Sequence, residues 1–373
     1  MWRGEYPEAI AAYARSSAKD SSFTLPEILT AFVYYEMGKC RQTDSIGRSL
    51  APRRVRLERW DRMMLDRQLA RCRGDWGEAL ALAREGRELA SSSDMAAEIV
   101  MDAALDAHRP REAVAVFDSI RPDAKRVRGT YPITDSFLWS LHLLGKYERE
   151  LTEARTLRHE SPDDIQAMQY EAEALAAEGK TGDIRALIDK SLTAPPLPLE
   201  NPGNLMQIAG AELRIHGCGR AADSIEARSI VWYGTLPSDE AASERIWAGL
   251  ALVLAEAGHL SDATALYEKL TLGHPDSVGY RGALGVLAAR QGNRARAERE
   301  DAWLASLHLP YLIGANTLWC ARIAARFGDR DRALTLLRRA ISEGQRIAHE
   351  MHQIVDWESL RSDPVFQAIM RPE

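Results

Sequence analysis

The stretch Trp247–Pro275, WAGLALVLAEAGHLSDATALYEKLTLGHP, contains two apolar helix faces separated by a glycine. Its first half repeats apolar residues at the i, i+3, i+4, i+7 spacing of one helix face, namely Trp247, Leu250, Ala251 and Leu254. Its second half places three more on a second helix, namely Ala263, Tyr267 and Leu270. Gly258 tolerates the left-handed conformation that ends a helix, and Pro275 closes the unit. The stretch therefore predicts a helix–turn–helix hairpin.

The same turn recurs along nearly the whole chain, usually with an alanine five residues after the turn residue. Successive turns lie 34 to 41 residues apart, at Gly4, Gly38, Gly74, His108, Gly145, Gly179, Gly217, Gly258, Gly292 and Gly328. Some copies are degenerate, since His108 replaces the glycine, Glu150 and Ile184 replace the alanine, and the copy around Gly38 has no recognisable alanine. Strand signals are nearly absent. The repeat predicts an all-α array.

With this period, this turn and these helix faces, the chain resembles the tetratricopeptide repeat (TPR) family over nearly its full length. The resemblance implies a right-handed TPR-type α-solenoid of helix–turn–helix repeats, with about nine complete hairpins preceded by half of another. We expect an N-terminal stack over residues 1–192, a proline-rich connection over 193–203 and a C-terminal stack over 204–373 that ends in a capping helix. A longer loop with continuous packing across it is the alternative.

In this family the first helix of each hairpin lines a concave groove, which implies a set of groove residues in the middle copies. They are Asp135, Trp139, His142, Gln166, Gln169, Glu173, Asn204, Gln207 and Arg214. The C-terminal copies give mostly small or apolar groove residues, such as Ala248, Leu252, Ala255, Val286 and Ala289. A polar groove with one tryptophan suits an extended peptide, although a concave face that is merely solvated would also be polar. The family's two-carboxylate clamp is not reproduced.

The two ends of the chain differ. The first turn, Gly4, has only three residues before it, so the following helix, with Ala9 and Ile10, lacks a partner. The end, Trp357–Phe366 (WESLRSDPVF), is similar to the closing segment of TPR regions in bacterial serine/threonine kinases or winged-helix transcriptional regulators. Asp363 is expected to cap a short final helix there. We expect a missing N-terminal effector domain, or else a second chain that covers the open face.

Composition argues against several function classes. Lys and Arg number 48 against 54 Asp and Glu, a net charge of −6, so nucleic acid is an unexpected partner. The most basic stretch, residues 48–73, is expected to form a solvated helix face with i,i+3 and i,i+4 ion pairs such as Glu58 with Arg62. A patch that binds nucleic acid or an acidic partner is the alternative. No stretch resembles a signal peptide or membrane span, which favours a cytoplasmic protein without a membrane partner.

Possible chemical motifs are weak. Gly179-Lys180-Thr181 lacks the first glycine and the strand of a phosphate-binding loop, so it is expected to be a repeat turn. The sequence His349-Glu350-Met351-His352 is one residue short of the zincin spacing, and we expect solvent-facing histidines. The scattered cysteines, Cys40, Cys72, Cys218 and Cys320, suggest free buried thiols rather than a zinc site or disulfides.

These observations predict no catalytic residue, no metal and no cofactor. The function they favour is a protein-interaction scaffold that binds a protein or peptide segment in the groove, as the regulatory part of a larger bacterial signalling protein. An enzyme with unrecognised chemistry and a self-standing adaptor that assembles as a homo-oligomer are the alternatives.

Overall fold

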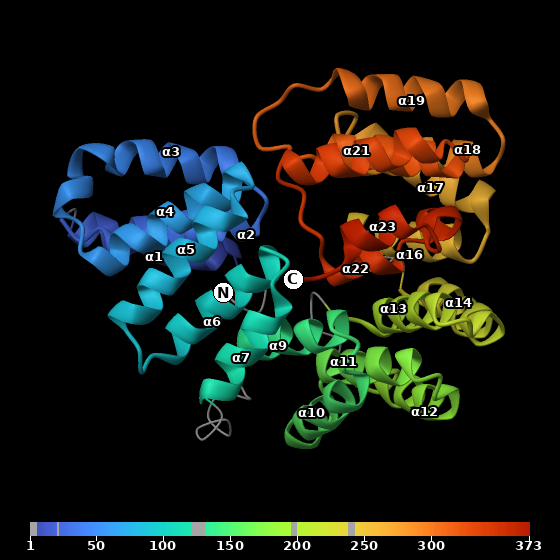
Figure 1. Cartoon of the computed structure of the whole chain (residues 1–373), viewed down its shortest axis with the longest axis horizontal. Coiled ribbons are helices and arrows are strands. Elements are labelled where there is room, and N and C mark those ends of the chain that lie inside the picture. The colour runs from blue at the N-terminus through green and yellow to red at the C-terminus, as the bar shows by residue number, and fades with distance from the viewer. Residues whose placement is uncertain (1–5, 21, 121–130, 195–199, 238–242) are drawn as a thin grey trace.

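The computed structural model describes residues 6–20, 22–120, 131–194, 200–237 and 243–373, with the backbone only for 131–133. Within these ranges every regular element is a helix (Figure 1). None of the described helices is long and apolar enough to cross a lipid bilayer. The expected turn at Gly4 lies outside the described residues.

After α1 (Tyr6–Lys19), nine helical hairpins follow one another in the described part of the chain. Their helices are α2 (Leu25–Glu36) and α3 (Cys40–Leu50), α4 (Arg59–Arg73) and α5 (Trp76–Leu89), α6 (Asp94–Asp106) and α7 (Pro110–Ile120), α9 (Tyr131–Leu143) and α10 (Tyr147–Glu160), α11 (Ile165–Ala177) and α12 (Thr181–Ser191), α13 (Pro202–Ile215) and α14 (Gly219–Gly234), α16 (Glu244–Glu256) and α17 (Leu260–Gly273), α18 (Val278–Arg290) and α19 (Arg294–Ser306), and α20 (Ala315–Arg326) and α21 (Arg330–Ser342). The described residues also contain four short elements, η1 (Ala51–Arg56), α22 (His349–Gln353), η3 (Val355–Leu360) and α23 (Pro364–Met370). The predicted α-solenoid of tetratricopeptide type is confirmed.

One backbone conformation forms all nine hairpin turns. The eight turn glycines from Gly38 to Gly328 have φ between 65° and 85°, and His108, which replaces the ninth, has φ 58°. At Gly258 the amide of His259 donates to the carbonyl of Leu254 (2.8 Å), a hydrogen bond that closes the end of α16. Because each turn directs the chain back along the preceding helix, the glycine period sets the length of every hairpin.

Small residues let the two helices of a hairpin approach closely. The alanines five residues after a turn are at most 1% exposed, namely Ala79, Ala113, Ala222, Ala263, Ala297 and Ala333. In the copy around Gly38, Thr43 takes the position and its hydroxyl donates to the carbonyl of Ala31 (3.1 Å). This degenerate copy therefore keeps its two helices packed together.

The apolar core continues past the proline-rich connection. One cluster joins Ile184 and Leu187 of α12 to Leu205 and Met206 of α13. Residues 195–199 of the connection lie outside the described residues. The division of the chain into two stacks at 193–203 stays a prediction.

The C-terminal cap forms as the sequence predicts. Asp363 accepts hydrogen bonds from the amides of Val365 (2.8 Å) and Phe366 (3.2 Å) at the start of α23. Phe366 and Met370 are buried against α20 and α21 in one apolar cluster. At the other end, α1 packs on α2 and buries none of its residues.

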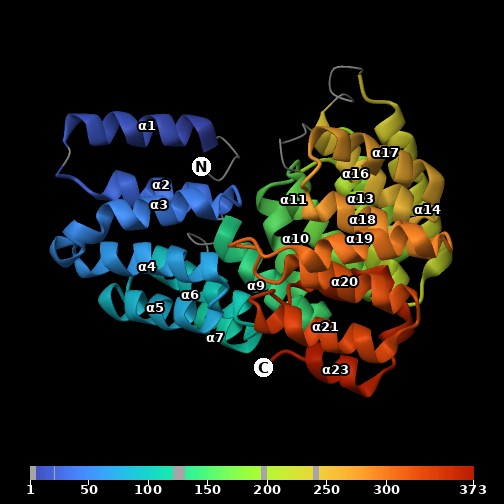
Figure 2. The same cartoon turned by 90° about the horizontal axis from the view of Figure 1, so that it is seen from above.

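The solenoid curves so that its C-terminal part reaches earlier hairpins (Figures 1 and 2). Trp76 Nε1 donates to the carbonyl of Gly344 (2.8 Å), and the amide of Glu373 donates to the carbonyl of His108 (3.1 Å). A Cβ atom added to Gly74 would lie 2.6 Å from the Cα of Gly344, so the backbones touch. The last residues of the chain therefore lie against the second and third hairpins.

The expectation of four free thiols is wrong for one pair. Cys40 and Cys72 form a disulfide, with Cα atoms 5.4 Å apart. Cys40 begins α3 and Cys72 lies near the end of α4, which packs antiparallel to α3, so the repeat itself brings the two together. Cys218 and Cys320 are free.

Two alanine substitutions test the role of the turn conformation. An added Cβ meets no atom within 4 Å at Gly258 (φ 85°) or at Gly182, which lies inside α12. Gly258→Ala should therefore lower the free energy of unfolding by about 1 kcal/mol, the cost of a left-handed residue. Gly182→Ala should raise it by about 0.5–1 kcal/mol, because alanine favours the helix. Urea unfolding followed by circular dichroism measures both, and shifts of the same sign would contradict the assignment.

Candidate functional site

A buried polar cluster lies where α9, α10 and α13 face one another. His142 Nδ1 lies 3.0 Å from Glu150 Oε2, and His142 Nε2 lies 3.0 Å from Glu212 Oε1. Burial lowers the pKa of His142, but the two carboxylates outweigh it and raise the pKa well above its usual value. Glu150 occupies the position that is alanine in other copies, so this departure from the repeat places a carboxylate beside the imidazole.

The chain's own C-terminal part occupies the middle of the concave face. Residues 345–356, here called the groove segment, contain α22 and connect α21 to η3. Ile347 and Met351 pack into the apolar cluster of the last hairpin. On the other side, the ring of His349 stacks on Trp139 with centroids 4.5 Å apart, and Arg346 Nη1 lies 2.5 Å from Asp106 Oδ1. The groove segment therefore faces the earlier hairpins with its polar side chains.

Gln353 joins the groove segment to the polar cluster. Its Nε2 donates to Glu173 Oε1 (3.2 Å) and to Glu212 Oε2 (3.1 Å). Glu173 is fully buried, its Oε2 has no hydrogen-bond partner, and burial raises its pKa to about 8. The carboxyl is therefore mostly protonated at neutral pH, which lowers the cost of burying it.

The expectation that His349 and His352 face solvent is wrong. His349 is 5% exposed, and burial lowers the pKa of His352 to about 4. Both belong to the groove segment, whose location inside the solenoid depends on contacts with distant hairpins. In the described part of the chain, no group of three or more His, Cys, Asp or Glu side chains could hold a metal ion.

The structure divides the nine predicted groove residues among different environments. Trp139, Gln169, Asn204 and Gln207 line a cavity described below. His142 and Glu173 are buried under the groove segment, and Asp135 with Gln166 surrounds the hydroxyl of Tyr170. Burial raises the pKa of Asp135 to about 7. Arg214 instead pairs with Glu226 (2.5 Å) and Asp223 (2.9 Å) of its own hairpin, outside the cavity lining.

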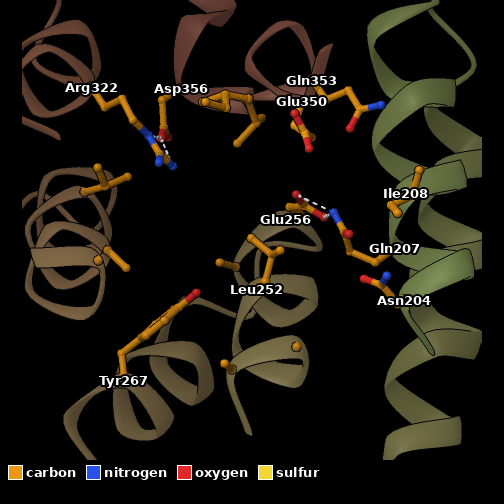
Figure 3. A pocket seen from close by; sticks show the side chains of 18 of the residues that line it. Asn204, Gln207, Ile208, Leu252, Glu256, Tyr267, Arg322, Glu350, Gln353 and Asp356 are labelled. Carbon is orange, nitrogen blue, oxygen red and sulfur yellow. Dashed lines mark hydrogen bonds and ion pairs between the residues drawn. The ribbon is translucent and has the colours of Figure 1, made fainter. Parts of the chain in front are cut away.

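A cavity of about 710 Å³ lies on the C-terminal half of the concave face (Figure 3). Its walls come from α13, α16, α18 and α20, and η3 with the groove segment closes one side. This volume is within the usual range of about 300–1,000 Å³ for ligand pockets. Four of the apolar groove positions predicted for the C-terminal copies line it, Ala248, Leu252, Ala255 and Val286.

One end of the cavity is polar. Arg322 pairs with Asp356 of η3 (2.8 Å), and Gln207 Nε2 donates to both carboxyl oxygens of Glu256 (3.0 and 2.9 Å), as Figure 3 shows. Burial raises the pKa of Glu256 to about 8. Arg290 Nη1 donates to the carbonyl of Ala255 (2.6 Å) at the end of α16.

The other end is apolar and aromatic. Leu252 is 39% exposed and points into the cavity, and Tyr267 directs its hydroxyl toward the centre (Figure 3). Beside them lie small and aromatic residues, namely Ala248, Gly249, Gly279, Tyr280, Ala283 and Trp319. The cavity can therefore receive an apolar group with a polar group next to it.

Several cavity residues were missed from the sequence. Arg290 lies two residues before its turn Gly292, nearer than the predicted groove positions. Arg322 lies six residues before Gly328, the same spacing as Trp139 before Gly145, and Asp356 belongs to the groove segment. The repeat period could have singled out the arginines, because both precede a turn by a few residues. No local signal places Asp356 there.

Two other motifs have structural explanations. Gly179 is a repeat turn with φ 70°, so Lys180 and Thr181 begin α12 as expected. In the basic stretch, Arg48 and Arg59 are exposed as expected, but Arg67 and Arg71 are buried and pair with Asp102 of α6, which corrects the expectation for those two. Arg62 donates to the carbonyl of Leu57 (3.1 Å).

Comparisons with known proteins give distant structural likenesses and no more. No family model matches the chain, and no curated protein sequence matches it. A tetratricopeptide repeat protein from Parabacteroides merdae is 12% identical over 84% of this chain and 97% of its own, with a TM-score of 0.40. Human IFIT1 with m7Gppp-AAAA is 13% identical over 94% and 84% (TM-score 0.38), and maize PPR10 is 14% identical over 96% and 54% (TM-score 0.39). At these values the likenesses carry no argument about function.

The buried carboxyl of Glu173 gives a pH-dependent prediction. Its pKa rises from 4.5 to about 8 on folding, so the stabilisation from its proton is complete below pH 4.5 and is lost as the pH rises through about 8. Glu173→Gln removes this proton equilibrium. The free energy of unfolding of the variant, relative to the unchanged chain, should therefore rise between about pH 5 and 8, by up to about 1.4 kcal/mol per pH unit.

Urea unfolding at a series of pH values measures this difference. Glu148→Gln, on the exposed side of α10, is the matched control and should give an offset that does not change with pH. A constant offset for Glu173→Gln as well would contradict the buried, protonated state.

Proposed function

We propose that this chain is a non-catalytic interaction scaffold whose concave cavity binds a segment of a protein partner. The observation that carries the proposal is the cavity of about 710 Å³ between α13, α16, α18 and α20. Consecutive hairpins supply its walls, so a segment that follows the concave face contacts several repeats at once. Solenoids typically use such extended concave surfaces for binding.

The groove segment supports this proposal, because the same face already holds a peptide. His349 and Gln353, one helical turn apart, contact Trp139, Glu173 and Glu212 of three hairpins. Side-chain stacking and hydrogen bonds to buried carboxyl groups hold the segment in place. The concave face therefore has the chemistry to bind a polypeptide.

The lining of the cavity supports a binding role over a catalytic one. Among the described residues that line it there is no serine, threonine, cysteine or lysine. Asp356 is paired with Arg322, and Glu256 is bonded to Gln207. His349 and Glu350 of the lining lie 3.3 Å apart, but no serine, threonine, cysteine or lysine of the lining stands beside them as a nucleophile.

A narrower proposal concerns context. The similarity of residues 357–366 to the closing segments of kinase- and regulator-linked repeats supports a regulatory role in a larger bacterial signalling protein of the cytoplasm. In that role the cavity would bind a segment of the partner or of the effector domain.

Selection of random dodecapeptides displayed on phage against the full chain tests the binding role. Peptides should be selected, and Leu252→Arg should weaken their affinity at least tenfold, because it places a charged side chain in the apolar end of the cavity. Biolayer interferometry with the synthetic peptides measures the affinities.

Leu272→Arg is the control, because Leu272 on α17 is 86% exposed and does not line the cavity. It should leave the affinity unchanged. If no peptide is selected, or if Leu252→Arg and Leu272→Arg have equal effects, the proposed binding site is wrong.

A further inference from the structure

The two arginines at the polar end of the cavity differ in their ion pairing. Arg322 is paired with Asp356 at 2.8 Å and stacks on Trp319 with its guanidinium carbon 3.8 Å from the ring centroid. Arg290, by contrast, makes one hydrogen bond, to the main-chain carbonyl of Ala255, and forms no ion pair with any described residue. Its guanidinium lines the cavity with most of its donors unused.

No described carboxylate forms an ion pair with Arg290. Glu350, which also lines the cavity, lies 3.3 Å from His349 Nδ1. Glu256 lies nearby but is bonded to Gln207, and burial raises its pKa to about 8, so it is mostly uncharged at neutral pH. Asp356 is held by Arg322, with Arg326 3.9 Å from its second oxygen. Burial lowers the pKa of Arg290, and the attraction of Asp356 and Glu256 offsets this lowering only in part.

The neighbouring wall is apolar. Leu252 of α16 and Ala283 and Val286 of α18 line the cavity beside Arg290 at the end of α18. Ala283 and Val286 are 8% and 5% exposed, whereas the side chain of Leu252 is 39% exposed. An apolar side chain of a ligand can therefore pack on Leu252. An apolar surface next to a cation fits a ligand with the complementary pair of groups.

We infer that the segment bound in the cavity carries an aspartate or glutamate side chain that pairs with Arg290, beside an aromatic or aliphatic side chain that packs on Leu252. This inference rests on the proposed function. A guanidinium binds a carboxylate through two parallel hydrogen bonds, which an amide side chain cannot reproduce. A basic partner segment would instead meet Arg290 and the neighbouring Arg322 with like charge.

The dodecapeptide selection tests the inference, because a peptide joined to the coat protein at its C-terminus presents only side-chain carboxylates. The selected peptides should share an acidic residue next to an apolar one. In a synthetic, C-terminally amidated peptide, replacing that acid by its amide should weaken binding to the full chain about 10- to 100-fold. The same replacement should have little effect on binding to Arg290→Met, because the two changes remove one interaction.

Arg299→Met is the matched control, since Arg299 is exposed on α19 and does not line the cavity. In Arg299→Met, replacing the acid of the peptide by its amide should weaken binding as much as it does with the unchanged chain. Arg290→Lys, which keeps the charge and loses the planar fork, should bind the acidic peptide with intermediate affinity. If Arg290→Met fails to fold, the amide replacement measured on the unchanged chain and on Arg290→Lys still decides.

Failure of this inference can be distinguished from failure of the proposed function. Peptides that bind the cavity, lose affinity in Leu252→Arg and show no acidic preference overturn the inference and leave the proposed function standing. An equal loss on amide replacement in the unchanged chain and in Arg290→Met also overturns the inference. If no peptide binds at all, the proposed function fails, and the inference with it.

Discussion

The contact between the groove segment and the middle hairpins is the interaction on which the shape of the molecule depends. It is largely polar, since Gln353 donates to Glu173 and Glu212, and His349 stacks on Trp139. The apolar side chains of the segment pack on the last hairpin instead. A buried charged or polar group that loses its partner is costly, commonly by about 3–5 kcal/mol for an ion pair, so this contact fixes one alignment of the two surfaces. The solenoid is therefore closed at one defined curvature.

That closure decides which part of the concave face stays open. The polar groove of the middle hairpins, which looks like a peptide site in the sequence, is used within the molecule by residues 345–356. The part of the concave face that stays open lies on the C-terminal hairpins, where small residues such as Ala248 and Ala283 leave a cavity of about 710 Å³. An intramolecular contact and the cavity thus share one concave face, with Asp356 at their border.

Two residues that depart from the repeat pattern make structural contacts. Glu150 stands where most copies have alanine, and it is 1% exposed because His142 lies beside it. His108 stands where most copies have glycine, and its ring lies 3.3 Å from the carbonyl of Met370 in the C-terminal helix. Both residues weaken the match of their own copies to the repeat. Glu150 makes a buried contact within its own hairpin, whereas His108 joins distant parts of the chain.

The sequence by itself determined the hairpins, their number and their turns, because these depend on local properties. A glycine that adopts positive φ and apolar residues spaced for a helix act within a few residues, and nine turns from Gly38 to Gly328 have the expected conformation. The cap at Asp363 is local in the same way. Four of the nine predicted groove residues line the cavity, because the first helix of a hairpin does face inward.

Only the tertiary structure decided the rest. The partners of Arg346 and Gln353 lie 240 and 180 residues away along the chain, so their meeting depends on the curvature summed over the hairpins between them. The Cys40–Cys72 disulfide and the pairing of Arg67 with Asp102 likewise join neighbouring hairpins. Each hairpin adds a small rotation that no single repeat reveals, and the closure of the solenoid, the burial of its histidines and the location of its cavity follow from the sum.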